Sequence, residues 1–81
     1  MLVHRMQILI EVQSIFRDVF DDETLIISED TDANDIEGWD SYAHIVILAS
    51  IQDHYGIEFS TKEILGLGNV GDIISLIEKK L

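Results

Sequence analysis

The 81-residue chain contains no cysteine, so neither a disulfide nor a thiolate metal site can stabilise it. Basic residues are also scarce: five Lys and Arg stand against 16 Asp and Glu, which gives a formal net charge of −11. Nucleic-acid phosphates and anionic membranes are bound through basic side chains, and we expect neither as a partner. The longest apolar run, Ile45 to Ala49, is far below the roughly 20 residues of a membrane span, so no membrane insertion is expected.

Proline, Gly/Ser-rich linkers and internal repeats are absent as well, which predicts a single domain over residues 1–81. The 47% of hydrophobic residues is enough for a compact core. Glu11 interrupts the apolar stretch at the start of the sequence, and no small-residue cleavage site follows as in a signal peptide. We therefore expect a cytoplasmic protein, and a monomer.

Hydrophobic periodicity predicts a first helix from about Val3 to Val19 and a last helix that follows Asn69 as its N-terminal cap. The apolar stripe of the first helix is predicted to consist of Met6, Leu9, Val12, Phe16 and Val19. The stripe of the last helix is predicted to consist of Val70, Ile73, Ile74, Ile77 and Leu81. Both helices should pack against a common core.

A second helix is predicted to begin at Asp40 or Ser41, either of which can cap it, and to end near Tyr55 before a left-handed Gly56. Its core face is predicted to hold His44, Ile47, Leu48, Ile51 and Tyr55. The opposite face and its flank are predicted to carry Tyr42, Ile45, Val46, Ala49 and Asp53. Because this second set is largely apolar, part of the hydrophobic surface of the helix should be exposed.

A capping box at residues 60–63 (Ser-Thr-Lys-Glu) predicts a short helix to about Leu65, which Gly66 and Gly68 end. The predicted fold class is thus all-α: a small four-helix bundle of three main helices and one short helix, with a long first loop. That loop, from about Phe20 to Trp39, lies in a segment that carries ten acids and no base between Asp18 and Asp40. We expect it to be ordered against the bundle by its apolar residues, namely Leu25, Ile26, Ile27, Ile36 and Trp39.

Residues for catalysis or metal binding are few. His44 lies about one helical turn from Ser41 and could act as its base, but we interpret it as a residue at the rim of the core, and His4 and His54 as surface residues. Residues 30–34 match positions 1, 3 and 5 of a calcium-binding EF-hand loop. The rest of that pattern fails, because Asp35 stands where the turn needs glycine and Ser41 where a Glu should bind. We therefore predict no specific metal site and no enzyme.

Several short motifs together resemble the acyl and peptidyl carrier proteins. Residues 38–42 (Gly-Trp-Asp-Ser-Tyr) resemble that family's Asp-Ser-Leu attachment motif, in the variant with tryptophan before the aspartate. The stretch 43–48 follows as the family's second helix does, and residues 55–59 (Tyr-Gly-Ile-Glu-Phe) are similar to its exit from that helix. Residues 70–73 (Val-Gly-Asp-Ile) resemble the start of its last helix. The resemblance covers nearly the whole chain.

The resemblance implies a discrete carrier with an acyl-carrier-protein-like fold that does no catalysis itself. A phosphopantetheinyl transferase would use magnesium to move 4′-phosphopantetheine from coenzyme A onto the Ser41 hydroxyl, and Asp40 would help that enzyme recognise the site. The thiol of the arm would then hold an acyl or aminoacyl group as a thioester. A loading ligase and a downstream acyltransferase or synthase would be the further partners. The alternative is a helical protein–protein interaction module that kept the fold without the modification.

Two departures from the family pattern concern partner binding. Tyr42 stands where the family usually has leucine, and we interpret it as an apolar contact that affects specificity. The acids that fatty-acid carriers place on the outer face of this helix are replaced here by Ala43, Val46 and Gln52, and only Asp53 keeps a charge. We therefore predict that Tyr42, Ile45, Val46, Ala49 and Asp53 dock partners, with weaker salt dependence, in a specialised rather than a primary fatty-acid pathway.

Overall fold

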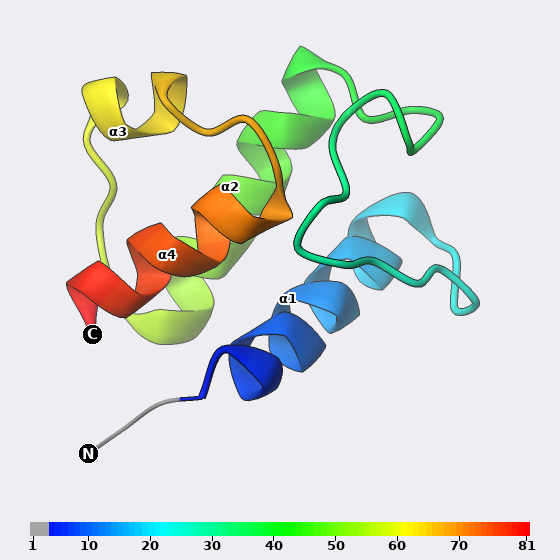
Figure 1. Cartoon of the computed structure of the whole chain (residues 1–81). Helices are drawn as coiled ribbons and strands as arrows, with labels where there is room; N and C mark the ends of the chain where they lie inside the picture. Colours follow the sequence, from blue (N-terminus) through cyan, green and yellow to red (C-terminus); the bar gives the residue numbers. More distant parts are fainter. Residues whose placement is uncertain (1–3) are drawn as a thin grey trace.

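The computed structural model describes residues 4–81, in which four helices and their loops enclose one hydrophobic core. The helices are α1 (Arg5–Phe20), α2 (Ser41–Tyr55), α3 (Thr61–Leu65) and α4 (Val70–Lys80). Helices α1, α2 and α4 surround the core, whereas the short α3 lies at the same end of the molecule as the start of α2 (Figure 1). The described residues contain no strand, and the predicted all-α fold with three main helices and one short helix is confirmed.

Local sequence signals determine where the helices begin and end. The left-handed Gly56 ends α2, and Asn69 caps α4 by accepting the Asp72 amide at 2.8 Å. At α3, the Ser60 hydroxyl accepts the Glu63 amide and the Glu63 carboxylate accepts the Ser60 amide, which is the predicted capping box. The C-cap of α1 is Asp21, whose φ of 51° is left-handed.

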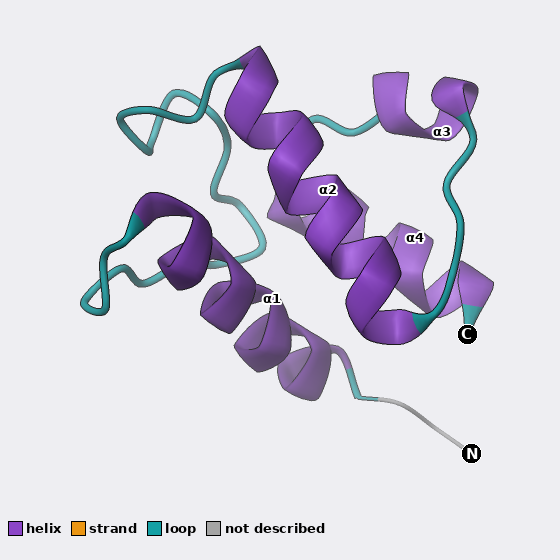
Figure 2. Cartoon of the chain, turned by 180° about the vertical axis from the view of Figure 1, so that it is seen from behind, coloured by secondary structure: helices purple, strands orange, loops and turns teal. Residues whose placement is uncertain are grey.

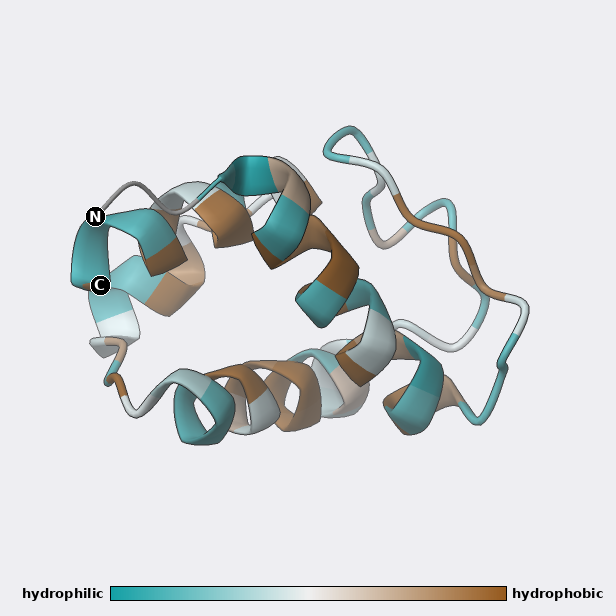
Figure 3. Ribbon diagram, turned by 90° about the horizontal axis from the view of Figure 1, so that it is seen from below, coloured by the Kyte–Doolittle hydropathy of each residue, from teal (hydrophilic) through white to brown (hydrophobic). Residues whose placement is uncertain are grey.

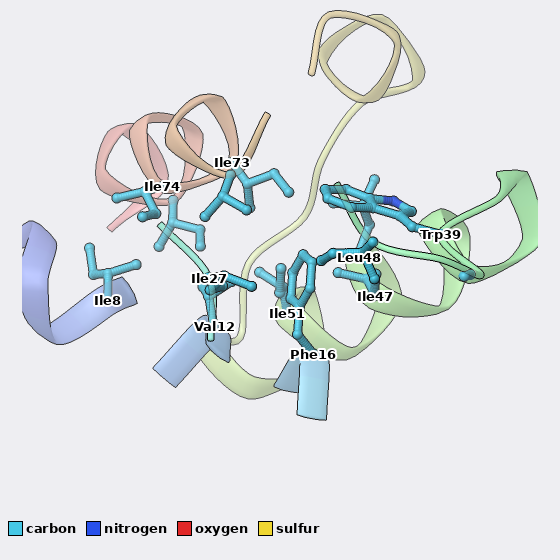
Figure 4. Packing of buried hydrophobic residues seen from close by; sticks show 14 of the residues in the cluster. Ile8, Val12, Phe16, Ile27, Trp39, Ile47, Leu48, Ile51, Ile73 and Ile74 are labelled. Atoms are coloured by element: carbon cyan, nitrogen blue, oxygen red, sulfur yellow. The ribbon is translucent and has the colours of Figure 1, made fainter. Parts of the chain in front are cut away.

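Side chains from α1, α2, α4 and the long loop meet in the core (Figure 4). Phe16 from α1 is fully buried and contacts Trp39, the residue that ends the loop, edge to face at 5.1 Å between ring centroids. Ile27 lies between the helices and anchors the middle of the loop (Figure 4). The loop is thus part of the hydrophobic core, as its apolar residues predicted, and Figure 3 shows hydrophobic colour along part of it.

Five predicted positions are wrong in detail. Met6 is 68% exposed, and its place in the core of α1 is taken by Ile8. Leu81 and Ile26 are exposed rather than buried. Two residues assigned to the outer face of α2 turn inward: Ala43 is buried, and the Gln52 side chain accepts the Phe59 amide at 2.8 Å. The predicted start of the first helix at Val3 lies outside the described residues.

The long loop is fastened to the start of α4 through backbone hydrogen bonds. The amides of Val70 and Gly71 lie in the first turn of α4 and therefore lack partners within the helix. They donate instead to the carbonyls of Thr31 and Glu29, at 2.9 and 2.8 Å. The loop thus completes the N-terminal end of α4, and the helix holds the loop in place.

Arg5 strengthens the same junction. Its guanidinium pairs with the Glu29 carboxylate at 2.6 Å and donates to the Gly71 carbonyl at 3.1 Å and to the Ser75 hydroxyl at 3.0 Å. The hydrogen bond to Glu29 raises the pKa of Arg5 and lowers the pKa of the Glu29 carboxyl. One side chain of α1 therefore connects the loop with α4.

Gly71 is the position where this junction is most sensitive to a side chain. A Cβ atom added to Gly71 would lie 3.0 Å from the Glu29 carbonyl oxygen, which the Gly71 amide already binds. We expect Gly71→Ala to lower the free energy of unfolding by about 1–3 kcal/mol, because helix and loop must separate. Thermal and urea unfolding, followed by circular dichroism, measure the change.

Gly66→Ala is the matched control for this variant. A Cβ atom there would meet its nearest neighbour, the Glu63 carbonyl oxygen, at an ordinary 3.6 Å, and the φ of −87° suits any residue. We expect its stability to stay the same or rise by up to about 1 kcal/mol. Equal losses in the two variants would show that the contact with Glu29 is not what restricts position 71.

Candidate functional site

The N-terminal end of α2 places Asp40 and Ser41 in different roles. The Asp40 carboxylate accepts the Ala43 amide at 2.8 Å, so Asp40 is the cap and Ser41 is the first residue of the helix. The structure assigns the Ser41 side chain no hydrogen bond to any group within residues 4–81, and the residue is exposed. Of the two capping candidates, Asp40 is thus structurally engaged and the Ser41 hydroxyl is accessible for chemistry.

A tight turn before α2 sets the direction in which this end of the helix points. Gly38 has a φ of +92°, a conformation that side-chain-bearing residues rarely adopt. The Asp40 amide donates back to the Gly38 carbonyl at 2.9 Å, and the Trp39 amide donates to the Ile36 carbonyl at 3.2 Å. The turn buries Trp39 while the next two residues stay exposed.

Trp39 and His44 form a hydrogen-bonded pair near Ser41. The Trp39 indole Nε1–H donates to His44 Nδ1 at 3.1 Å, and the two ring planes differ by 25° with centroids 5.9 Å apart. Partial burial lowers the pKa of His44 below its ordinary value. His44 therefore lies at the rim of the core, as predicted, and within the described residues it makes no hydrogen bond to Ser41 as a base would.

A groove opens next to Ser41 between α2, α3 and the loops. Its volume is about 530 Å³. We call it the Ser41 groove and define it by its lining residues, Ala33, Trp39, Asp40, Ser41, His44, Ile45, Ile64, Leu65, Leu67 and Gly68. Most of these side chains are apolar, so an apolar group attached at Ser41 has a surface to lie against.

The outer face of α2 is apolar and exposed beside this groove. Tyr42 is 78% exposed and Ile45 65%, while Ala49 and Asp53 are also exposed and Val46 is half-buried. Leu65 of α3, which the sequence analysis did not single out, is 81% exposed at the groove. The sequence does carry a signal for this exposure: Leu65 is the last residue before Gly66 in a helix of five residues, which is too short to cover an apolar side chain at its end.

Two acids of the long loop, Asp32 and Asp35, stabilise turns within it. The Asp32 carboxylate accepts the Asn34 amide at 2.9 Å, and the Asp35 carboxylate accepts the Asp32 amide at 3.0 Å. Among residues 4–81, no three His, Cys, Asp or Glu side chains are grouped so that they could hold a metal ion. Nor does any helix in that range have the length and apolar character to cross a membrane.

Comparison with known proteins connects this geometry to a family. A family model described as a phosphopantetheine attachment site matches residues 11–77. The chain belongs to that family. It is also similar to the holo acyl carrier protein of Geobacter metallireducens, with 43% identity over 89% of this chain and 83% of that one, and a TM-score of 0.83. No significant match was found among curated proteins.

Family membership establishes the general role of the chain. It is a carrier protein that has 4′-phosphopantetheine as its covalent group, and it is not an enzyme. Carriers of this family interact with the enzymes that modify them and with acyl-handling enzymes. The exposed hydroxyl at the start of α2 fits the covalent group, because it makes no hydrogen bond within residues 4–81 and the apolar groove lies beside it.

Proposed function

We propose that this chain is a discrete carrier that holds an acyl or aminoacyl group as a thioester on a 4′-phosphopantetheine arm at Ser41. The observation that carries the proposal is the exposed Ser41 hydroxyl, which follows a helix cap made by Asp40 rather than by Ser41 itself. A thioester needs a thiol, and a chain without cysteine gains one only from such an arm. The arm raises the effective concentration of the cargo at the active site of each partner.

Intact mass spectrometry tests the attachment site. After incubation with coenzyme A, Mg²⁺ and a broad-specificity phosphopantetheinyl transferase, the mass should increase by one phosphopantetheine group. Ser41→Ala should show no increase, whereas Ser50→Ala, a serine further along the same helix, should be modified like the wild type. An unmodified wild type would favour the alternative, an interaction module without the arm.

We further propose that enzymes dock on Tyr42, Ile45, Val46, Ala49 and Asp53, and that the pathway is a specialised one. Tyr42 and Ile45 expose apolar surface beside Ser41, and Asp53 is the one charged residue of the five. Contacts made through such a face depend on apolar burial more than on ion pairs, so added salt should weaken them little.

Ile45→Glu is the variant that probes this face. Because Ile45 is mostly exposed, we expect the melting temperature to change little, while the rate at which acyl-handling enzymes use the loaded carrier should fall at least about tenfold. Glu58→Ala, at an exposed position beyond the end of α2, is the matched control and should behave as the wild type. Unchanged enzyme rates with Ile45→Glu would contradict docking on this face.

A further inference from the structure

The Ser41 groove contains one hydrogen-bond donor whose direction is set by a buried neighbour. An indole Nε1–H can only donate, so its bond to His44 requires His44 Nδ1 to be the acceptor. In the neutral ring the proton then resides on Nε2. No group within residues 4–81 accepts a hydrogen bond from this Nε2–H, and the ring lines the groove. The donor therefore remains available to a ligand.

The position of His44 relative to Ser41 makes the first group of the arm its natural acceptor. Residues three apart lie on the same face of a helix, with Cβ atoms roughly 5–6 Å apart. Long side chains on a helix lean towards its N-terminus, which here is the Ser41 end. The phosphorus atom of an arm on Ser41 would be bonded directly to Oγ, so its oxygens lie within reach of an imidazole at position 44.

No stronger cationic donor competes for that phosphate in the groove. None of the lining residues, all of which the structure describes, is Lys or Arg. Arg5 pairs with Glu29, and the Arg17 guanidinium donates to the Leu25 carbonyl. The other ionisable group that lines the groove, the Asp40 carboxylate, is engaged by the Ala43 amide. Apart from Asp40, the residues that α3 and the loops contribute to the lining are uncharged.

We propose that His44, held by Trp39, donates its Nε2–H to a phosphate oxygen of the arm on Ser41 and so fixes the direction in which the arm leaves α2. His44 is thus a positioning residue, and a chain of two hydrogen bonds connects the core residue Trp39 with the arm. Partial burial lowers the pKa of His44 and so favours the neutral ring, which is the form that both bonds require. The proposal rests on the attachment at Ser41 proposed above.

Nuclear magnetic resonance on the apo and holo proteins tests this role, once intact mass has shown that the arm is present. Absence of the arm would count against the attachment site, while the readouts below concern His44. We expect the pKa of His44 to be higher in the holo than in the apo protein, because the phosphate anion favours the charged ring. The ³¹P resonance should shift with pH at the midpoint of His44. The exposed His4 and His54 do not line the groove and are controls, whose ring resonances at a fixed pH should be the same in both forms.

Two variants separate the hydrogen bond from the packing of the ring. His44→Phe keeps a ring that can pack against Trp39 but has no donor, whereas His44→Gln keeps a donor. We expect the phosphate of the Phe variant to be more mobile by ³¹P relaxation and its pH-dependent shift to be lost, while Gln restores the low mobility. Identical His44 titration in apo and holo protein, or a Phe variant with wild-type ³¹P relaxation, would overturn the proposal. If the Phe variant fails to fold, the wild-type titration decides alone.

Discussion

Replacing Phe16 by alanine should lower the free energy of unfolding by about 3–5 kcal/mol, the largest loss of stability that we expect from one substitution. Phe16 is fully buried and packs edge to face on Trp39. A domain of this size has a total stability of only about 4–12 kcal/mol, so this loss is a large fraction of the total. Urea unfolding followed by circular dichroism measures the loss.

Phe16→Ala should also disturb the functional site at the start of α2, because Trp39 immediately precedes Asp40 and Ser41. With the Phe16 ring removed, Trp39 loses one wall of its pocket, and its indole should become more accessible to a fluorescence quencher. Ile10→Ala, on the exposed side of the same helix, is the control and should cost less than about 1 kcal/mol. If both variants lose the same stability, the core is not organised around Phe16 and Trp39.

Asp40→Asn should reduce the rate of phosphopantetheine transfer at least about tenfold while changing stability little. Asparagine retains a side-chain oxygen that can accept the Ala43 amide, so the cap of α2 should persist. What the substitution removes is the negative charge beside Ser41, through which we propose that the transferase recognises the site. Initial rates from intact mass at limiting transferase measure this effect.

Asp40→Ala separates the two roles of the residue. This substitution removes both the charge and the cap. The variant should therefore be modified as slowly as Asp40→Asn, but it should lose a further roughly 1 kcal/mol of stability. Glu37→Gln removes an acid from the preceding turn without touching the cap, and it should be modified at the wild-type rate. If Asp40→Asn were modified as fast as the wild type, the charge of Asp40 would have no part in recognition.

Signals that act between neighbouring residues were sufficient to predict the elements. The capping box at Ser60 and Glu63, the stop at Gly56 and the cap at Asn69 each depend on contacts within a few residues. The Asp-Ser motif likewise located the start of α2. These interactions are local, so the sequence specifies them without knowledge of the tertiary structure.

The wrong predictions concern which side of a helix or loop segment a residue takes. At 100° per residue, Ile8 is about 40° from Val12 around α1 and Met6 about 120°, so a strict helical period favours Ile8 for the core. Ile26 lies in a loop without regular structure, where no helical period decides which side a residue takes, and it is exposed while its neighbour Ile27 is buried. Leu81 continues the α4 stripe in sequence, but it lies one residue past the end of the helix.

Contacts between distant segments could not be predicted at all. Arg5 reaches Glu29 and Ser75 across 24 and 70 residues, and no spacing rule links these positions. The same holds for the Ser41 groove, which forms because the chain returns after α2 and places α3 at the same end of the molecule as the start of α2, as Figure 2 shows from behind. Trp39 and His44 are close in sequence, yet their hydrogen bond depends on the burial of Trp39 against Phe16.

Thiol titration tests the central claim, attachment of the arm at Ser41, most directly, because the chain has no cysteine and every thiol must come from the arm. The protein is treated with coenzyme A, Mg²⁺ and transferase, separated from free coenzyme A, and reacted with a thiol reagent under denaturing conditions. We expect no thiol before treatment, one thiol per chain after it, and none at any stage in Ser41→Ala. One thiol per chain in treated Ser41→Ala, or none in the treated wild type, would contradict the attachment of a thioester-bearing arm at Ser41.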